Sequence, residues 1–253
     1  MTDRTSLILT DDFPTPRTKL KSFRLAVAEH ANCVGLWRFD NESLLTRVST
    51  LVSSMANWKA GGPTLEQATA GDRVGTTTDA ITGRQIGSFV NATSQYYTIS
   101  GASMNALLPF TIGVIVKPVD LGQTTVIAGS QGGGEDAYIG LAGNFSARAV
   151  YGTGVAVGPV LAANKWCSIL MSYDGASKIP FISVNGGSPI GGTTAATEVT
   201  VINQFRLSQS TAAAFQGSFG AAALFNTNML TNTGNAQLLE DWENFASAWK
   251  AGL

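Results

Sequence analysis

The chain has 253 residues, of which 44% are hydrophobic, enough for a sizeable core, and only 13% are charged, about half the usual share. Its net charge of −1 gives no attraction toward nucleic acid or anionic lipid, and no apolar window is long enough to span a bilayer. The first residues also lack the basic-then-apolar order of a signal peptide. We therefore expect no nucleic-acid or membrane partner, and a surface built largely from small residues.

The N-terminal residues predict an extended arm followed by a short helix. Two prolines in residues 1–22 exclude a helix and disfavour a central strand. Residues 23–30 then have a helical composition. We expect residues 1–30 to form this arm and helix, and residues 31–253 to form one domain, because no linker or internal repeat divides them.

The next segments combine one clear strand with two stretches of weaker pattern. Residues 33–39 alternate so that Trp37 and Phe39 share one face of a strand. Residues 42–58 place apolar residues at helical spacing, but their serine and threonine content favours a loop or a strand, so we expect a loop with a possible helix. Residues 60–84 are rich in glycine, threonine and aspartate and predict a long surface excursion.

A continuous β pattern begins at Gln85. Apolar and polar residues alternate in short runs here, and turn residues separate these runs. The expected strands are 86–90 and 96–100, paired as a hairpin, then 110–118, then a meander of 124–129, 137–141 and 147–151.

Turn signals punctuate the C-terminal part of the chain. A strand that begins near Trp166 ends at an Asp-Gly pair, residues 174–175, and the next strand ends at an Asn-Gly pair, residues 185–186. Both pairs suit the positive φ angles of tight hairpin turns. A Phe-x-Gly step at residues 215–217 begins the last expected strand.

Residues 231–250 predict a C-terminal helix with Thr231 as its cap. Large apolar residues recur along one side of this segment at the spacing of a helix face that packs against a core. This stripe consists of Leu238, Leu239, Trp242, Phe245 and Trp249.

This order of elements resembles the C-terminal half of a concanavalin A-like, or laminin-G-like, jelly roll. In that fold a Trp-led strand ends in a Tyr-Asp-Gly turn, the next strand ends in Asn-Gly, and a Phe-x-Gly strand precedes a final helix. The resemblance implies an all-β sandwich of two antiparallel sheets, with residues 110–118 inside one sheet. The expected core is Trp37, Phe39, Phe110, Ile112, Val114, Ile169, Met171, Tyr173, Phe181, Val184, Phe205, Leu207, Phe219 and Leu224.

The chain lacks the side chains that catalysis in this fold group requires. Many relatives of the fold are glycosidases, which need two carboxylates facing each other across a sugar, commonly on a Glu-x-Asp-x-x-Glu strand. No such strand is present, and the acidic pairs at 11–12, 135–136 and 240–241 fall in the arm, a loop and a helix. His30 is the only histidine, so no nucleophilic triad forms either. We expect neither an enzyme nor a cofactor.

Thiol and calcium chemistry have few candidates. Cys33 and Cys167 lie in apolar runs, and we expect buried free thiols, with one disulfide as the alternative. Laminin-G-like and lectin domains often bind calcium through loop carboxylates, which leaves Glu135, Asp136 and Asp174 as candidates. Asp174, which precedes a glycine, is explained better as a turn former.

Sugar binding without catalysis requires exposed aromatic side chains near loop ends. Trp37 and Trp166 lie on expected strands, and we expect both to be buried. The aromatic residues expected outside the core, as glycan contacts, are Trp58, Tyr96, Tyr138 and Tyr151.

Three functions follow from these patterns. The first is a non-enzymatic structural protein of a bacteriophage virion, a capsid decoration, head-fibre or tail component, made in the host cytoplasm. It would contact other virion proteins and copies of itself through the arm and small-residue loops. The second is a lectin-like module that binds a cell-surface glycan during host adsorption. The third, disfavoured by the missing carboxylate pair, is a glycoside hydrolase.

Overall fold

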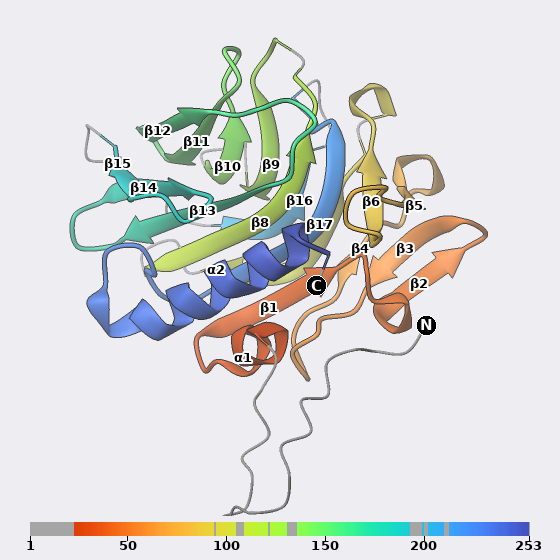
Figure 1. Ribbon diagram of the computed structural model, residues 1–253, viewed down its shortest axis with the longest axis horizontal. Helices are drawn as coiled ribbons and strands as arrows, with labels where there is room; N and C mark the ends of the chain where they lie inside the picture. Colours follow the sequence, from red (N-terminus) through yellow and green to blue (C-terminus); the bar gives the residue numbers. More distant parts are fainter. Residues whose placement is uncertain are drawn as a thin grey trace, which may run out of the picture.

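The computed structural model describes residues 23–252, apart from residues 94, 105–108, 121, 131–135, 193–198, 200–201 and 210–212. Two helices, α1 (Phe23–Glu29) and α2 (Ala236–Lys250), flank antiparallel strands that fold into two layers (Figure 1). The strands are β1 (Cys33–Arg38), β2 (Leu45–Val48), β3 (Leu51–Met55), β4 (Leu65–Glu66), β5 (Gly75–Thr78), β6 (Gln85–Phe89), β7 (Tyr97–Met104), β8 (Phe110–Pro118), β9 (Thr125–Ser130), β10 (Ala137–Leu141), β11 (Ser146–Tyr151), β12 (Gly154–Val160), β13 (Cys167–Asp174), β14 (Ile179–Val184), β15 (Ile190–Gly191), β16 (Ile202–Leu207) and β17 (Gly217–Phe225). The predicted arm, residues 1–22, lies outside the described residues.

The first layer is built around β8, in which nearly every residue is buried. β8 pairs with β13 on one side and with β17 on the other. The layer continues from β13 through β14 to β15, and β17 also pairs with β1 and β6. The prediction that residues 110–118 lie inside a sheet is therefore confirmed.

The second layer runs in the order β4, β7, β16, β9, β10, β11 and β12. The predicted meander is confirmed, because β9, β10 and β11 are consecutive antiparallel neighbours. The short strands β2, β3 and β5 connect the two layers at one edge through β4 and β6. The chain is thus an all-β sandwich of the jelly-roll-like class with a C-terminal helix, as predicted.

The main core lies between the layers, and twelve of the fourteen predicted core residues are buried. The exceptions are Phe181 and Val184, which are half-buried. These two positions lie on opposite faces of β14, because side chains alternate across a strand. Ile182 fills the inner position, and Phe181 packs toward the helical side of the first layer.

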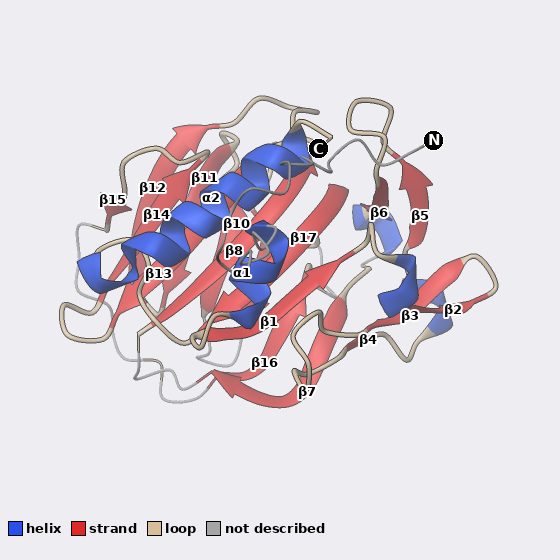
Figure 2. Ribbon diagram, turned by 60° about the horizontal axis from the view of Figure 1, so that its bottom comes forward, coloured by secondary structure: helices blue, strands red, loops and turns tan. Residues whose placement is uncertain are grey.

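The helix α2 lies along the outer face of the first layer, across β13, β8 and β17 (Figure 2). Its predicted apolar stripe is buried, apart from the half-buried Leu239. Two glycines make room for the indoles: a Cβ atom at Gly113 would lie 2.8 Å from Cζ2 of Trp242, and one at Gly220 would lie 2.5 Å from Cζ2 of Trp249. The helix docks closely because β8 and β17 carry no side chain at these points.

Several local predictions are wrong. Residues 42–58 form a turn of 3-10 helix and the β2–β3 hairpin, and residues 60–84 contain β4 and β5. Residues 86–90 and 96–100 do not pair with each other, because β6 pairs with β5 and β17 while β7 pairs with β4 and β16. The helix begins at Ala236 and is preceded by a turn in which Asn232, not Thr231, accepts a hydrogen bond from a backbone amide. Each error concerns a pairing or an end that long-range contacts decide.

Candidate functional site

A cavity of about 320 Å³ lies between α1 and the loop that follows β3. Small and apolar side chains form part of its wall, and an indole, a carboxylate and an ammonium group form the rest. A volume of this size suits a small ligand, and sites of this kind join apolar walls to a few polar groups. The lining residues are Leu25, Ala28, Glu29, Trp58, Lys59 and Ala60.

The loop that carries Trp58 is held against β1 by the side chain of Asn57. Its Oδ1 accepts hydrogen bonds from the backbone amides of Leu36 and Lys59, at 3.0 and 2.9 Å, and its Nδ2 donates to the carbonyl of Val34 at 3.2 Å. The amide of Trp58 also donates to the carbonyl of Leu36 at 2.9 Å. The loop is therefore fixed by polar contacts although it is not a strand.

Lys59 ties this loop to the end of α1. Its ammonium group donates to the carbonyl of Cys33 and, at 3.5 Å, to that of His30. His30 follows α1 directly and Cys33 begins β1, and the His30 carbonyl also accepts the backbone amide of Cys33 at 3.0 Å, so the lysine binds the turn that joins α1 to β1. The same lysine thus closes one side of the cavity and keeps its two walls together.

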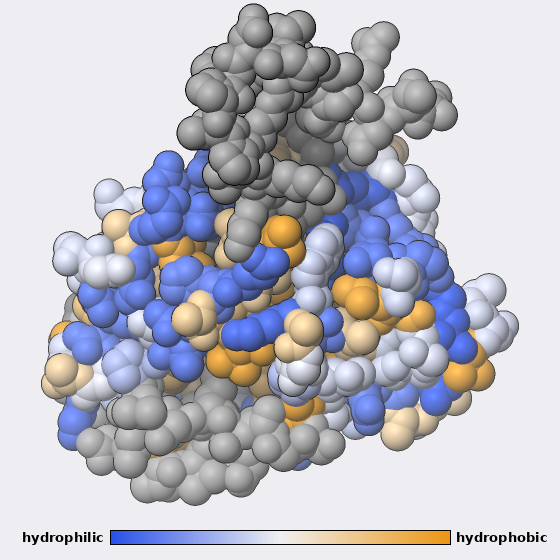
Figure 3. Space-filling view, turned by 90° about the horizontal axis from the view of Figure 1, so that it is seen from below, coloured by the Kyte–Doolittle hydropathy of each residue, from blue (hydrophilic) through white to orange (hydrophobic). Residues whose placement is uncertain are grey.

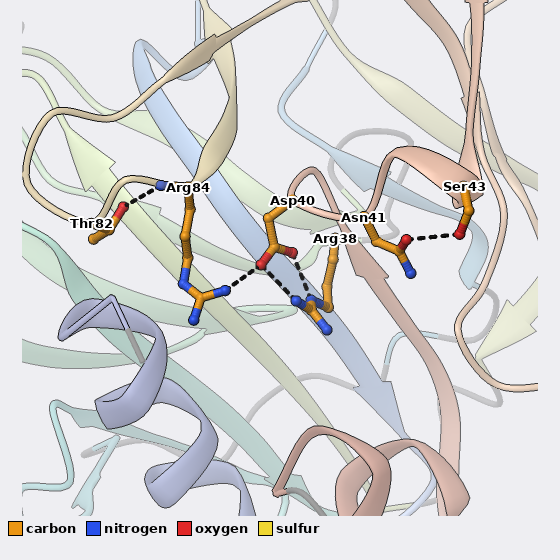
Figure 4. A network of polar contacts seen from close by, with 6 residues as sticks. All are labelled: Arg38, Asp40, Asn41, Ser43, Thr82 and Arg84. Atoms are coloured by element: carbon orange, nitrogen blue, oxygen red, sulfur yellow. Dashed lines mark hydrogen bonds and ion pairs between the residues drawn. The ribbon is translucent and has the colours of Figure 1, made fainter. Parts of the chain in front are cut away.

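The indole of Trp58 rests on a buried ion-pair network. The guanidinium of Arg38 lies 4.3 Å from the centre of the Trp58 ring, with the ring of Phe245 also near it, at 5.7 Å. Arg38 is held by two bonds to Asp40, from Nε to Oδ1 at 2.7 Å and from Nη2 to Oδ2 at 2.6 Å. Arg84 donates to the same carboxylate at 2.7 Å, so Asp40 lies between two guanidinium groups (Figure 4).

This network fixes the orientation of the Trp58 ring. The side chains of Arg38 and Asp40 are only 2% and 4% exposed, and a bidentate pair of this kind holds the guanidinium plane in one direction. A guanidinium stacked on an indole attracts the ring electrostatically. Trp58, which is half-buried, is therefore a pre-positioned aromatic wall of the cavity.

A second polar cluster lies beside the C-terminal end of α2. Asp79 accepts hydrogen bonds from the ammonium of Lys117, from Nε1 of Trp166 at 3.0 Å and from Thr82, and the Trp166 ring packs on Trp249 at 4.6 Å. Burial alone would raise the pKa of Asp79, but these hydrogen bonds outweigh it and hold the pKa well below its usual range. A carboxylate so fully engaged is a structural anion rather than a proton donor or acceptor in catalysis.

The four predicted glycan contacts fall in different places. Trp58 lines the cavity, and Tyr96 is half-buried on the second layer, where the Arg206 guanidinium lies 5.5 Å from its ring centre. Tyr138 and Tyr151 are 4% and 0% exposed, so the prediction that they lie outside the core is wrong. Tyr151 points between the layers and stacks on Tyr173 at 3.6 Å. Trp166 is half-buried rather than buried as predicted.

The metal, thiol and acid candidates give no second centre in the described part of the chain. Within it, no three histidine, cysteine or acidic side chains are grouped as metal ligands, and Glu135 lies outside it. Asp174 accepts a hydrogen bond from the amide of Ala176 at 3.1 Å, as a turn former does. Cys33 and Cys167 are buried free thiols, as predicted, and burial raises their pKa values to about 11 and about 12.

Sequence reasoning missed three residues of this region: Glu29, Arg38 and Lys59. The one available signal was Arg38 in an otherwise apolar strand two residues before Asp40, since a buried arginine requires a partner. Figure 3 views the molecule from the side of α1 and shows small hydrophobic patches separated by hydrophilic residues. Neither α1 nor α2 is long and apolar enough to cross a membrane.

No family model matches the chain, and no curated protein matches its sequence. Among solved structures it is similar to a Trypanosoma rangeli sialidase in complex with the inhibitor DANA, at 14% identity over 85% of this chain and 33% of that chain, with a TM-score of 0.60. It is also similar to the binding domain of Paraclostridial Mosquitocidal Protein 1, at 10% identity over 83% and 52% of the two chains, with a TM-score of 0.61.

A third similar structure is domain 4 of AbnA, a GH43 extracellular arabinanase from Geobacillus stearothermophilus, in complex with arabinotriose. The identity is 17%, the match covers 84% of this chain and 99% of that domain, and the TM-score is 0.51. The chain spans about a third of the sialidase and about half of the mosquitocidal binding domain. These likenesses agree with the β-sandwich that the sequence predicted, and none of the three proteins is a bacteriophage protein.

Proposed function

We propose that the chain is a non-catalytic carbohydrate-binding domain that recognises a saccharide in the cavity beside Trp58. The observation that carries this proposal is the indole itself, which lines the cavity and is fixed by its stacking on Arg38. A pre-positioned aromatic face binds the apolar face of a sugar ring with little loss of conformational entropy. The arabinotriose complex of the similar arabinanase domain gives independent support for a saccharide as ligand.

The other walls supply the polar contacts that a sugar requires. The carboxylate of Glu29 is an acceptor for hydroxyl groups, and the ammonium of Lys59 has donors in addition to those that its two carbonyl contacts use. Leu25 and Ala28 provide apolar contact on the helix side. The combination of one ring, one acceptor and one donor suits a single sugar unit rather than a long groove.

The absence of catalysis is part of the proposal and is supported by the lining of the cavity. Most glycosidases use two carboxyl groups at opposed positions, and Glu29 is the one acidic residue among the lining residues, which also include no tyrosine to replace one of them as nucleophile. No cofactor or metal enters the proposal. The predicted bacteriophage origin and virion contacts stay predictions, because the arm assigned to those contacts lies outside the described residues.

The test is binding of neutral oligosaccharides, arabinotriose among them, by the full chain and by Trp58→Ala. We expect the substitution to weaken binding at least about tenfold, equivalent to about 1.4 kcal/mol, and Trp58→Phe to retain part of the affinity. Ile81→Ala, which removes an exposed apolar side chain of the β5–β6 turn, serves as the control. Equal binding by Trp58→Ala, or release of sugar products by the wild type, would contradict the proposal.

A further inference from the structure

His30, the only histidine of the chain, lies in the turn that joins α1 to β1. Its ring nitrogen Nδ1 accepts a hydrogen bond from the backbone amide of Asn32 at 3.1 Å. A ring nitrogen that accepts an N–H bond carries no proton, so this contact exists only with the neutral imidazole. The geometry of the turn therefore depends on the charge state of one side chain.

Asn32 is held in place from its other side. Its side-chain amide donates to Oδ1 of Asn235, at the start of α2, at 3.4 Å, and its carbonyl accepts the backbone amide of Asn226 at 3.0 Å. Protonation of Nδ1 would place an N–H group opposite the amide N–H of Asn32. Two donors that face each other without an acceptor make an unfavourable contact, and because Asn32 is fixed, it is the imidazole of His30 that has to turn away.

The same turn is bonded to a wall of the cavity. The ammonium group of Lys59, which lines the cavity, donates to the carbonyls of His30 and Cys33. These bonds join α1 to the loop that follows β3, and α1 and this loop are the two walls of the cavity. A change at His30 thus reaches the cavity through Lys59.

The charges around His30 oppose a second cation in this turn. Its contacts in the described chain bring three titratable groups to it: Glu29 on α1, Cys33 on β1 and Lys59 from the loop after β3. From the side of α2 the contact is Asn235, which does not titrate. Burial raises the pKa of Cys33 to about 11, so this thiol stays neutral. Glu29 is exposed, so water screens its attraction for a positive imidazole, whereas Lys59, which would repel it, is half-buried.

We propose that His30 is a pH-sensitive switch of the saccharide site: the neutral imidazole holds the two walls of the cavity together, and protonation separates them. This proposal rests on the proposed function of the cavity and adds its regulation. On protonation the bond from Asn32 is lost and a second cation enters the turn that binds Lys59. Lys59 then leaves its carbonyls, α1 moves away from the loop, and the saccharide can no longer contact Leu25 and Trp58 at once. Because histidine ordinarily changes charge at about pH 6.5, the site binds at neutral pH and releases its ligand in mildly acidic surroundings.

The experiment measures binding by the full chain at pH 7.5 and at pH 5.5, with arabinotriose as the first probe and then the neutral oligosaccharide that binds most tightly at pH 7.5. We expect the affinity to fall at least about fivefold at pH 5.5, which is the low end of the usual coupling between two sites. His30→Asn should bind equally well at both pH values, because its Oδ1 can replace Nδ1 as acceptor and an amide does not titrate. His30→Ala, which has neither acceptor nor charge, should also show no pH dependence but should bind more weakly than His30→Asn.

Proton release gives a second readout that a merely structural role of His30 would not produce. If the protonated protein binds sugar less well, sugar binding near pH 6.5 must release protons. Calorimetry in two buffers of different ionisation enthalpy measures this release, and we expect a fraction of one proton for the wild type and none for His30→Asn. Burial raises the pKa of Glu243 on α2, and His30→Asn retains this group, so any release from the glutamate would persist in the variant.

The outcomes separate the switch from the site itself. If the wild type binds neutral oligosaccharides at neither pH, the proposed function is wrong and the switch with it. If it binds them equally well at both pH values while Trp58→Ala binds weakly, the site stands and the switch is refuted. A pH dependence that His30→Asn retains refutes the switch as well. Melting temperatures at both pH values show whether each variant is folded; should His30→Asn not fold, the wild type decides, and binding without proton release near pH 6.5 refutes the switch.

Discussion

Two arginine–carboxylate pairs have nearly the same geometry but differ in burial. Comparing them tests how much burial changes the contribution of an ion pair to the free energy of unfolding. Arg38 and Asp40 join through contacts of 2.7 and 2.6 Å, and Arg47 and Glu42 through contacts of 2.6 and 2.8 Å. The first pair is 2% and 4% exposed, the second 21% and 59%. Asp40→Asn and Glu42→Gln each remove one negative charge with little change of shape, so they form a matched comparison. Asp40 also neutralises Arg84.

The expected costs differ severalfold. Asp40→Asn leaves the buried Arg38 without a counter-charge, and breaking a buried pair in this way costs about 3–5 kcal/mol. Glu42→Gln breaks a pair that water screens, which costs about 1 kcal/mol or less. Equilibrium unfolding in urea gives both free energies, provided that the slope with denaturant is unchanged. If the two variants lose the same stability, the premise that Arg38 requires Asp40 is wrong, and so is the view that this network fixes Trp58.

Two further predictions concern the helix and the thiols. Trp242→Ala should lower the free energy of unfolding by about 3–5 kcal/mol, because the buried indole fills the space over Gly113. Trp242→Phe should lower it by less than about 2 kcal/mol, because this substitution also removes a buried Nε1 that has no partner in the described chain. Thermal or urea unfolding measures both, and an undisturbed stability in Trp242→Ala would mean that the helix is not docked. With pKa values of about 11 and about 12, Cys33 and Cys167 should not react with an aromatic disulfide reagent at neutral pH until the protein is unfolded; rapid reaction in the native state would contradict their burial.

The elements that sequence predicted best are those whose own pattern determines burial. Alternation along residues 110–118 predicted the strand β8, which the resemblance to jelly rolls placed inside a sheet, and the stripe that includes Trp242 and Trp249 predicted the buried face of α2. Both patterns extend over enough residues to identify the period of a strand in the first case and of a helix in the second. The turn pair that ends β14 was equally informative, since Asn185 and Gly186 have positive φ angles of 54° and 74°. The expectation of positive φ at Asp174-Gly175 is wrong, because in that turn it is Lys178 that has a positive φ, of 56°.

The candidate sites could not be predicted because distant segments form them. That Tyr138 and Val150 share a side of the sheet can be inferred only once the β10–β11 register is known. A register shift of one residue would move the side chains to the opposite face of the sheet. The same limit explains why Tyr151 was assigned to the surface although it points inward. The cavity depends on Lys59 reaching carbonyls 26 and 29 residues away in the chain, a contact that no local pattern indicates.

The structure also changes the meaning of the small-residue composition, on which the expectation of an assembly surface depended. The run Ala221–Ala223 on β17 is at most 1% exposed, and two of its residues pack in the cluster beneath α2. Gly113 and Gly220 are required there for the same reason, since the helix brings two indoles against the sheet. Small residues in this chain therefore serve close packing inside the molecule as well as its surface. Composition alone no longer distinguishes a virion component from an isolated binding domain, whereas the fixed Trp58 ring indicates a ligand chemistry that can be measured.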